Sequence, residues 1–138
     1  IEEAENQFQL AIGITSETHN ILNHIGNIYL ELKKPNSALP YYIRSAEIMP
    51  GHIPSILNIG VTYELIGDFK RAFSYYNVAI ERAPLDARCW YALGLANFNK
   101  GDIKGAKAAW EKTLRLTPNN HPLRQEVHNR MTTLSDQG

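Results

Sequence analysis

The chain has 138 residues, 43% hydrophobic and 20% charged, which fits one globular domain or a short repeat array. No apolar run reaches the roughly 18 residues that span a bilayer, and the single cysteine, Cys89, excludes an internal disulfide. Net charge is zero but unevenly divided: residues 1–69 hold 8 acidic and 3 basic side chains, and residues 70–138 hold 6 and 11.

Residues 1–18 open the chain with an acidic, polar stretch, IEEAENQFQL, that lacks the pattern of a secretory signal. The compartment stays unknown from the sequence, with the cytoplasm as the first expectation. Ala4, Phe8 and Ala11 stand 34 residues before Ala38, Tyr42 and Ser45, a step that recurs further along the chain and predicts a helix over this segment.

Residues 19–52 predict two helices joined by a short turn. Lys33-Lys34-Pro35 marks the turn, because proline is favoured in the first turn of a helix. Pro50 ends the second helix, since proline cannot continue the backbone hydrogen-bond ladder.

Residues 53–86 and 87–120 repeat this plan at a step of 34 residues. Gly67-Asp68 and Gly101-Asp102 form their turns, with glycine free to adopt positive φ and aspartate able to cap the next helix. Four columns keep the step: Gly26, Gly60 and Gly94; Ala38, Ala72 and Ala106; Tyr42, Tyr76 and Trp110; Pro50, Pro84 and Pro118. Glycine facing alanine is expected to bring the paired helices together, with the aromatic ring filling the space beside them.

A 34-residue step with these columns resembles the tetratricopeptide repeat family. The resemblance covers three full repeats, 19–52, 53–86 and 87–120, and implies an all-α fold: a right-handed α-solenoid of antiparallel helix pairs with about eight helices. Residues 1–18 would be the second helix of a truncated repeat, so that the chain begins in mid-repeat. Residues 121–138 would form a C-terminal capping helix, with a polar outer face and an apolar stripe of Leu123, Val127, Met131 and Leu134.

The residues carry no catalytic or metal-binding pattern, so no enzyme activity, cofactor or metal is expected. A phosphate-binding loop and a G-x-S-x-G motif are absent, and His121 and His128 share a helical face without a further ligand at metal spacing. Basic residues of the C-terminal half fall mostly on second helices without interleaved aromatics. Nucleic acid, membrane and small-molecule substrate are therefore not the expected partners.

In the family that this chain resembles, the first helix of each repeat lines a concave groove that contacts peptides or partner helices. The resemblance implies that seven exposed first-helix positions contact the ligand: Asn23, Asn27, Asn58, Arg88, Tyr91, Leu95 and Phe98. Asparagine can both donate to and accept from a peptide backbone, and the apolar stripe of the last three residues would take apolar side chains. Packing of that stripe against the neighbouring first helix is the alternative.

Family members that bind the C-terminal tails of heat-shock chaperones use a clamp of lysine, asparagine and arginine side chains. The matching positions here hold Asn23, Asn27, Asn58, Arg88 and Ala92. Asn23 and Ala92 replace two cations, which removes most of the charge-assisted hydrogen bonding that a dicarboxylate needs.

The expected function is a non-enzymatic scaffold module that binds a protein or peptide in the concave groove. Two alternatives stay open. The divided charge would favour head-to-tail assembly into a homo-oligomer. The array could also regulate an enzyme domain of a longer protein.

Overall fold

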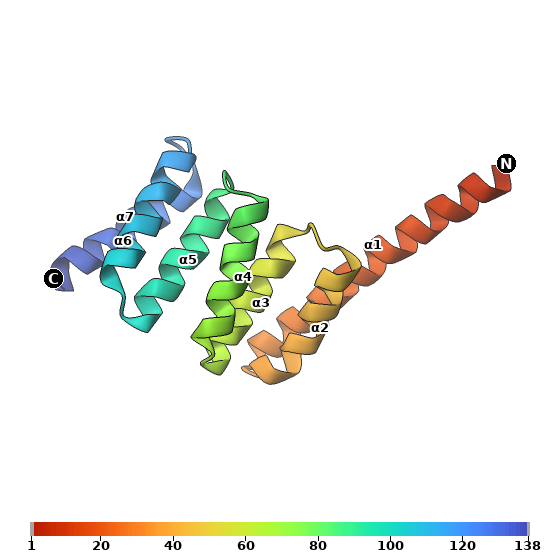
Figure 1. The fold of residues 1–138 in the computed structure, drawn as a ribbon, viewed down its shortest axis with the longest axis horizontal. Helices are drawn as coiled ribbons and strands as arrows, with labels where there is room; N and C mark the ends of the chain where they lie inside the picture. The colour runs from red at the N-terminus through yellow and green to blue at the C-terminus, as the bar shows by residue number, and fades with distance from the viewer. Residues whose placement is uncertain (1, 138) are drawn as a thin grey trace.

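The computed structural model describes the backbone of residues 2–137 and the side chains of residues 17–134. The regular structure of this part of the chain consists of seven helices (Figure 1): α1 (Glu2–Glu31), α2 (Pro35–Ile48), α3 (Ile53–Ile66), α4 (Phe69–Arg82), α5 (Ala87–Lys100), α6 (Ile103–Leu116) and α7 (Pro122–Gln137). Helices adjacent in the chain pack on one another, as antiparallel pairs closed by α7. The predicted all-α solenoid is confirmed. None of the described helices is long and apolar enough to cross a membrane.

The first helix is longer than the expected repeat boundaries suggest. α1 runs unbroken from Glu2 to Glu31, across the boundary placed between residues 18 and 19, and the described part of the chain has seven helices, close to the expected eight. The prolines that follow α2, α4 and α6 have no counterpart one period earlier, where Ser16 stands. Because serine keeps its backbone N–H, the helix continues and its first half projects from the stack as an arm (Figure 1). The side chains at positions 4, 8 and 11 lie outside the described residues.

The turns within the helix pairs follow the predicted chemistry. Gly67 and Gly101 both have φ of 98°, the left-handed region that favours glycine. Asp68 and Asp102 cap α4 and α6, each accepting a hydrogen bond from the backbone N–H three residues later, at 3.1 and 2.9 Å. Lys33 makes the corresponding turn with φ of 60°, which is unusual for a residue with a side chain.

Each helix pair is closed by one buried ring that lies on a glycine. The rings are Tyr42, Tyr76 and Trp110, with exposed fractions of 0, 0 and 1%. A Cβ atom added to the glycines 16 residues earlier would lie 2.6, 2.5 and 2.3 Å from these rings; the glycines are Gly26, Gly60 and Gly94. The close approach is thus glycine against an aromatic ring, rather than the glycine against alanine that the sequence suggested.

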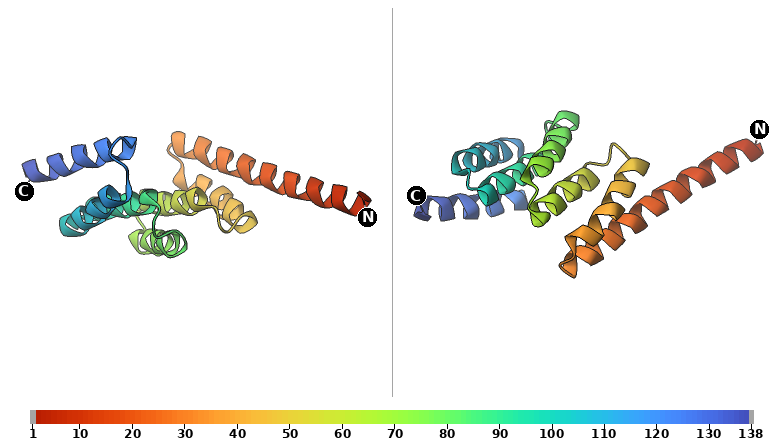
Figure 2. Two further views of the ribbon diagram at one scale, coloured as in Figure 1. Left: turned by 90° about the horizontal axis from the view of Figure 1, so that it is seen from above. Right: turned by 60° about the horizontal axis from the view of Figure 1, so that its bottom comes forward.

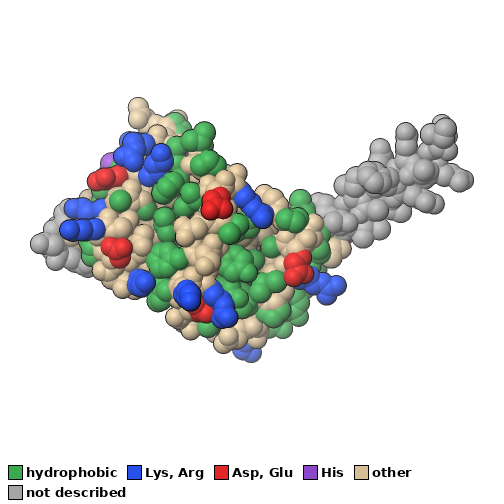
Figure 3. Space-filling model, viewed as in Figure 1, with side chains coloured by type: hydrophobic (Ala, Val, Ile, Leu, Met, Phe, Trp, Pro, Cys, Tyr) green, Lys and Arg blue, Asp and Glu red, His purple; other side chains and the backbone are tan. Residues whose placement is uncertain are grey.

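The last helix covers the end of the stack with its apolar stripe. Val127 and Leu134 are 0 and 4% exposed and form one cluster with Trp110 and Ala106 of α6. Seen from above, α7 and α1 lie on the same side of the remaining helices (Figure 2). On the face drawn in Figure 3, Lys and Arg side chains are most numerous over α6 and the first turn of α4, which matches the divided charge of the sequence.

Candidate functional site

A groove of about 390 Å³ crosses the first helices α3 and α5 and reaches α7. We call it the first-helix groove; its lining residues are Val61, Glu64, Leu65, Phe69, Leu95, Asn99 and Arg130. Leu65 and Val61 are 60 and 37% exposed, although both are apolar. Neighbouring exposed apolar side chains in a groove are typical of a surface that contacts a partner.

The acidic side chain of this groove is held in place by two hydrogen bonds. The Tyr76 hydroxyl donates to Glu64 Oε2, and Asn99 Nδ2 donates to Glu64 Oε1 at 3.1 Å. Burial, and then the bond to Glu64, raise the pKa of Tyr76, so its hydroxyl stays a donor. The same ring lies on Gly60, so the close helix contact in the core also positions the carboxylate in the groove.

The basic side chain of the groove comes from the capping helix. Arg130 Nε donates to the Tyr91 hydroxyl at 2.8 Å, and Arg130 Nη2 lies 3.5 Å from Glu126 Oε1. The Tyr91 hydroxyl in turn donates to Glu126 Oε1 at 3.0 Å. The Arg130 side chain remains 40% exposed, so it presents a cation to solvent at the rim of an apolar surface.

Only one of the seven residues predicted from the sequence, Leu95, lines the first-helix groove. Tyr91 and Phe98 lie on the same helix outside the lining, and like Leu95 they pack, partly buried, against the cluster of Trp110 and α7. The Phe98 ring centroid is 6.1 Å from that of Trp110. Part of the predicted apolar stripe is therefore covered by α6 and the capping helix α7.

The predicted polar residues lie on α1, α3 and α5 but outside this lining. Asn23 Nδ2 donates to Ser55 Oγ at 3.1 Å, whereas exposed Asn27 accepts a hydrogen bond from the Tyr42 hydroxyl. Asn58 is half-buried on α3.

Arg88, at the start of α5, is exposed and pairs with Asp86. The distance from Arg88 Nη2 to Asp86 Oδ2 is 2.6 Å, and this bond lowers the pKa of the Asp86 carboxyl.

Six lining residues of the groove lie outside the predicted set: Val61, Glu64, Leu65, Phe69, Asn99 and Arg130. Arg130 reaches Tyr91 across 39 residues of chain, a contact that no local pattern indicates. Exposed apolar side chains at first-helix positions, such as Leu65, were the available signal for the groove itself.

A second polar cluster joins α1 to the start of α3. His19 is 2% exposed, its Nδ1 lies 2.7 Å from Ser45 Oγ, and its ring centroid is 4.4 Å from that of His52. His52 caps α3, because its Nδ1 accepts a hydrogen bond from the backbone N–H of Ser55 at 3.3 Å. Burial, followed by the charges of His19 and Arg88, lowers the pKa of His52.

Stability should therefore fall as the pH drops below 6.5, the ordinary pKa of histidine. The unfolded state binds a proton at that pH, whereas folded His52 resists it until its own lower pKa is reached. Urea unfolding at a series of pH values between about 7.5 and 5 measures the loss. His52→Asn keeps a capping oxygen without a titrating ring, so it should lose less stability over this range. If the unsubstituted protein and the His52→Asn variant lose the same stability, protonation of His52 is not the cause.

The single cysteine lacks the surroundings of a reactive nucleophile. Cys89 is fully buried, and burial followed by the charge of Asp86 raises the pKa of its thiol to about 11. A neutral, enclosed thiol is a poor nucleophile. Among the described residues, no three His, Cys, Asp or Glu side chains are grouped to hold a metal ion.

Comparison with known proteins places the chain in a family. Models described as tetratricopeptide repeat match residues 17–85 and 87–120. The heat-shock protein cognate co-chaperone sgt12 of Aspergillus fumigatus is 30% identical over 94 residues, 68% of this chain and 28% of that protein. Anaphase-promoting complex subunit 3 of Schizosaccharomyces pombe is 29% identical over 102 residues, 74% of this chain and 14% of that protein. The chain spans less than a third of the length of the curated relatives it matches.

Solved structures share the same arrangement of helices. The type III secretion translocator chaperone SycD of Yersinia enterocolitica has a TM-score of 0.80 at 16% identity, over 94% of this chain and 96% of that chain. The first tetratricopeptide domain of Spaghetti (RPAP3), bound to the HSP90 peptide SRMEEVD, has a TM-score of 0.69 at 24% identity, over 87 and 95%. At these identities the likeness concerns the fold alone. With more than half of its residues matched by the family models, the chain belongs to the tetratricopeptide repeat family.

Proposed function

We propose that this chain is a non-enzymatic module that binds a protein or peptide in the first-helix groove. The observation that carries the proposal is the exposure of Leu65 and Val61 beside the cation of Arg130. Support also comes from a relative, since the matched protein of Aspergillus fumigatus is a co-chaperone.

The lining favours a partner segment with an apolar side chain and a carboxylate. The apolar side chain would cover Val61, Leu65 and Leu95, and the carboxylate would pair with Arg130. Glu64 offers little to a partner cation, because both of its oxygens already accept hydrogen bonds. Asn27 and Asn58, on the neighbouring first helices, would bond the backbone of an extended segment that continues toward α1.

A chaperone-tail clamp is not part of this proposal. Of the five matching positions, Ala92 is 9% exposed, Asn23 bonds Ser55, and Arg88 pairs with Asp86. Two carboxylates at one chain end would therefore find few cations there. Self-assembly and regulation of an attached enzyme domain stay predictions from the sequence.

Peptides selected from a random library displayed on phage would test the groove directly. We expect the selected peptides to share an apolar residue and to lose about tenfold or more in affinity when Leu65 is changed to serine, as for a central interface anchor. Arg130→Gln should weaken only those peptides that carry a carboxylate. Isothermal titration calorimetry gives the affinities.

Leu85→Ser is the matched control, because Leu85 is 77% exposed in the turn between α4 and α5, outside the groove lining. It should leave affinity unchanged. Peptides that bind the Leu65 and Leu85 variants equally well would show that recognition lies elsewhere on the molecule.

A further inference from the structure

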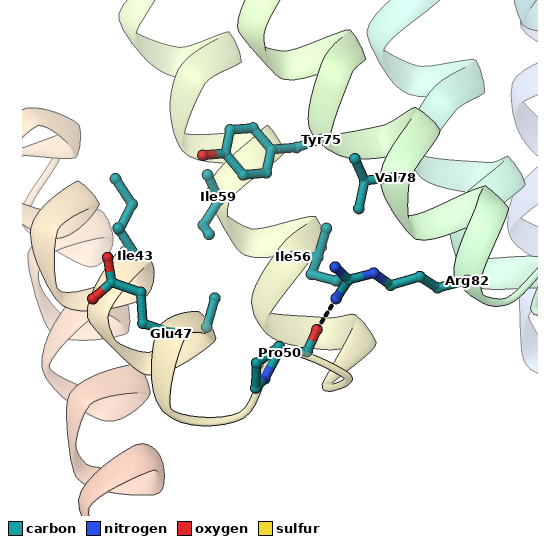
Figure 4. Close-up of a pocket in the computed structure, with 9 residues that line it drawn as sticks. Ile43, Glu47, Pro50, Ile56, Ile59, Tyr75, Val78 and Arg82 are labelled. Atoms are coloured by element: carbon teal, nitrogen blue, oxygen red, sulfur yellow. Dashed lines mark hydrogen bonds between the residues drawn. The ribbon is translucent and has the colours of Figure 1, made fainter.

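A second hollow lies between the second helices α2 and α4, above α3, and differs from the first-helix groove in every lining residue. Its volume is about 280 Å³, just below the roughly 300–1,000 Å³ of small-molecule sites, which suits a single side chain. We call it the α2–α4 pocket; it is lined by Ile43, Ala46, Glu47, Pro50, Ile56, Ile59, Tyr75, Val78 and Arg82. Figure 4 shows its labelled apolar side chains surrounding an open space, with Glu47 and Arg82 at opposite sides.

The chain fills the equivalent space of the next repeat with an indole. One period after Ile56 stands Trp90, whose Nε1 donates to the carbonyl oxygen of Pro84 at 3.0 Å. Lys112 lies over this indole, with Nζ 5.8 Å from the ring centroid. Pro84 and Lys112 stand one period after Pro50 and Val78, which both line the α2–α4 pocket. Trp90 thus occupies, between α4 and α6, the place that is open between α2 and α4.

Two smaller residues explain why the first of these spaces is open. Ile56 replaces the larger Trp90, and Ala46 stands where the next repeat has Ile80. The proline carbonyl is present in both repeats. In the α2–α4 pocket it accepts a hydrogen bond from Arg82, as the dashed line in Figure 4 marks. The carbonyl oxygen of Pro50, which corresponds to the Pro84 acceptor of Trp90, is therefore covered by Arg82. The Arg82 side chain is exposed and can rotate away from it.

We propose that the α2–α4 pocket binds a tryptophan side chain of a partner protein, next to a basic residue that pairs with Glu47. The indole would lie between Pro50 and Val78, as Trp90 lies between Pro84 and Lys112, and donate its N–H to the Pro50 carbonyl. Arg82 would then lie over the ring, as Lys112 does over Trp90.

The charges at the rim select the residue beside the tryptophan. Glu47 is exposed and is the one carboxylate among the lining residues of the pocket. It lines the pocket together with Tyr75, the aromatic residue of the wall. A lysine or arginine beside the tryptophan would complement this carboxylate, whereas a partner glutamate would be repelled.

The test uses a synthetic peptide, acetyl-Ser-Lys-Trp-Lys-Ser-amide, and methyl NMR spectra of the whole chain. We expect saturable shifts at the methyl groups of Ile43, Ile56 and Val78. Replacing the tryptophan with leucine should weaken binding by about tenfold or more, the usual loss at an aromatic anchor. Replacing both lysines with glutamate should weaken it as well.

Two variants that copy the next repeat should close the pocket. Ala46→Ile introduces the side chain of Ile80, and Ile56→Trp introduces that of Trp90, so each should abolish the shifts; if one fails to fold by circular dichroism, the other decides. Leu65→Ser in the first-helix groove should leave them unchanged, which separates this pocket from the proposed function. Absence of saturable shifts, equal affinity for the tryptophan and leucine peptides, or retained binding in a folded filled variant would each overturn the proposal.

Discussion

Trp110→Ala should lower the free energy of unfolding by about 3–5 kcal/mol, the usual cost of removing a large buried aromatic side chain. Trp110 is 1% exposed and packs with Val127 and Leu134 of α7, so its loss would leave a cavity between two helices. Its Nε1 also donates to the Tyr91 carbonyl oxygen at 3.4 Å. Urea unfolding followed by circular dichroism measures the change.

Trp90→Ala is the control for the loss of a tryptophan as such. Trp90 is half-buried on α5, under Lys112 of α6, rather than enclosed, and its removal should cost clearly less. An equal loss of unfolding free energy in the two variants would contradict the assignment of Trp110 to the buried rings of the core and of Trp90 to the surface.

Gly94→Ala should also destabilise the protein, although alanine is the better helix former by about 1 kcal/mol. The added Cβ would lie 2.3 Å from Trp110 Nε1 and 2.4 Å from its Cδ1, and the ring is enclosed, with 1% of its surface exposed. Overpacking of this kind costs about 1–3 kcal/mol, which exceeds the helix-forming gain. Gly51→Ala, where no atom lies within 4 Å of the added Cβ, should be close to neutral.

Combining the two substitutions gives a sharper result. In the Trp110→Ala background the ring that Gly94 touches is gone, so Gly94→Ala should become stabilising by up to about 1 kcal/mol, its helix propensity alone. The sign of one substitution would thus depend on the other. Additive effects would show that the close contact between Gly94 and the ring does not control the packing of α5 on α6.

The fold was predictable from the sequence because its determinants are short-range and occur three times. A glycine and an aspartate in adjacent positions specify a turn and a cap by local backbone chemistry, as at Gly67 and Asp68. The unbroken α1 was also readable in principle, since Ser16 stands where each later repeat has proline. The repeat columns describe what the repeats share, whereas this helix continues because of a residue in which the first segment differs.

The candidate site was less predictable, because it depends on where α7 lies. That helix follows the last full repeat, and its position is set by apolar packing of Val127 and Leu134 on Trp110. This packing partly buries Tyr91 and Phe98, which the sequence placed in the groove, and brings Arg130 to its rim. Contacts between residues 39 apart, such as Tyr91 with Arg130, follow from tertiary packing rather than from spacing.

Packing chiefly between adjacent helices determines how the molecule unfolds. Because each helix contacts chiefly its neighbours in the chain, stability is close to a sum of local terms, and one end can open while the other stays folded. A ligand in the first-helix groove would contact α3, α5 and α7 at once. Binding would then link segments that otherwise unfold separately. The unfolding transition should therefore become more cooperative along the array, in addition to the stability gained from the binding energy itself.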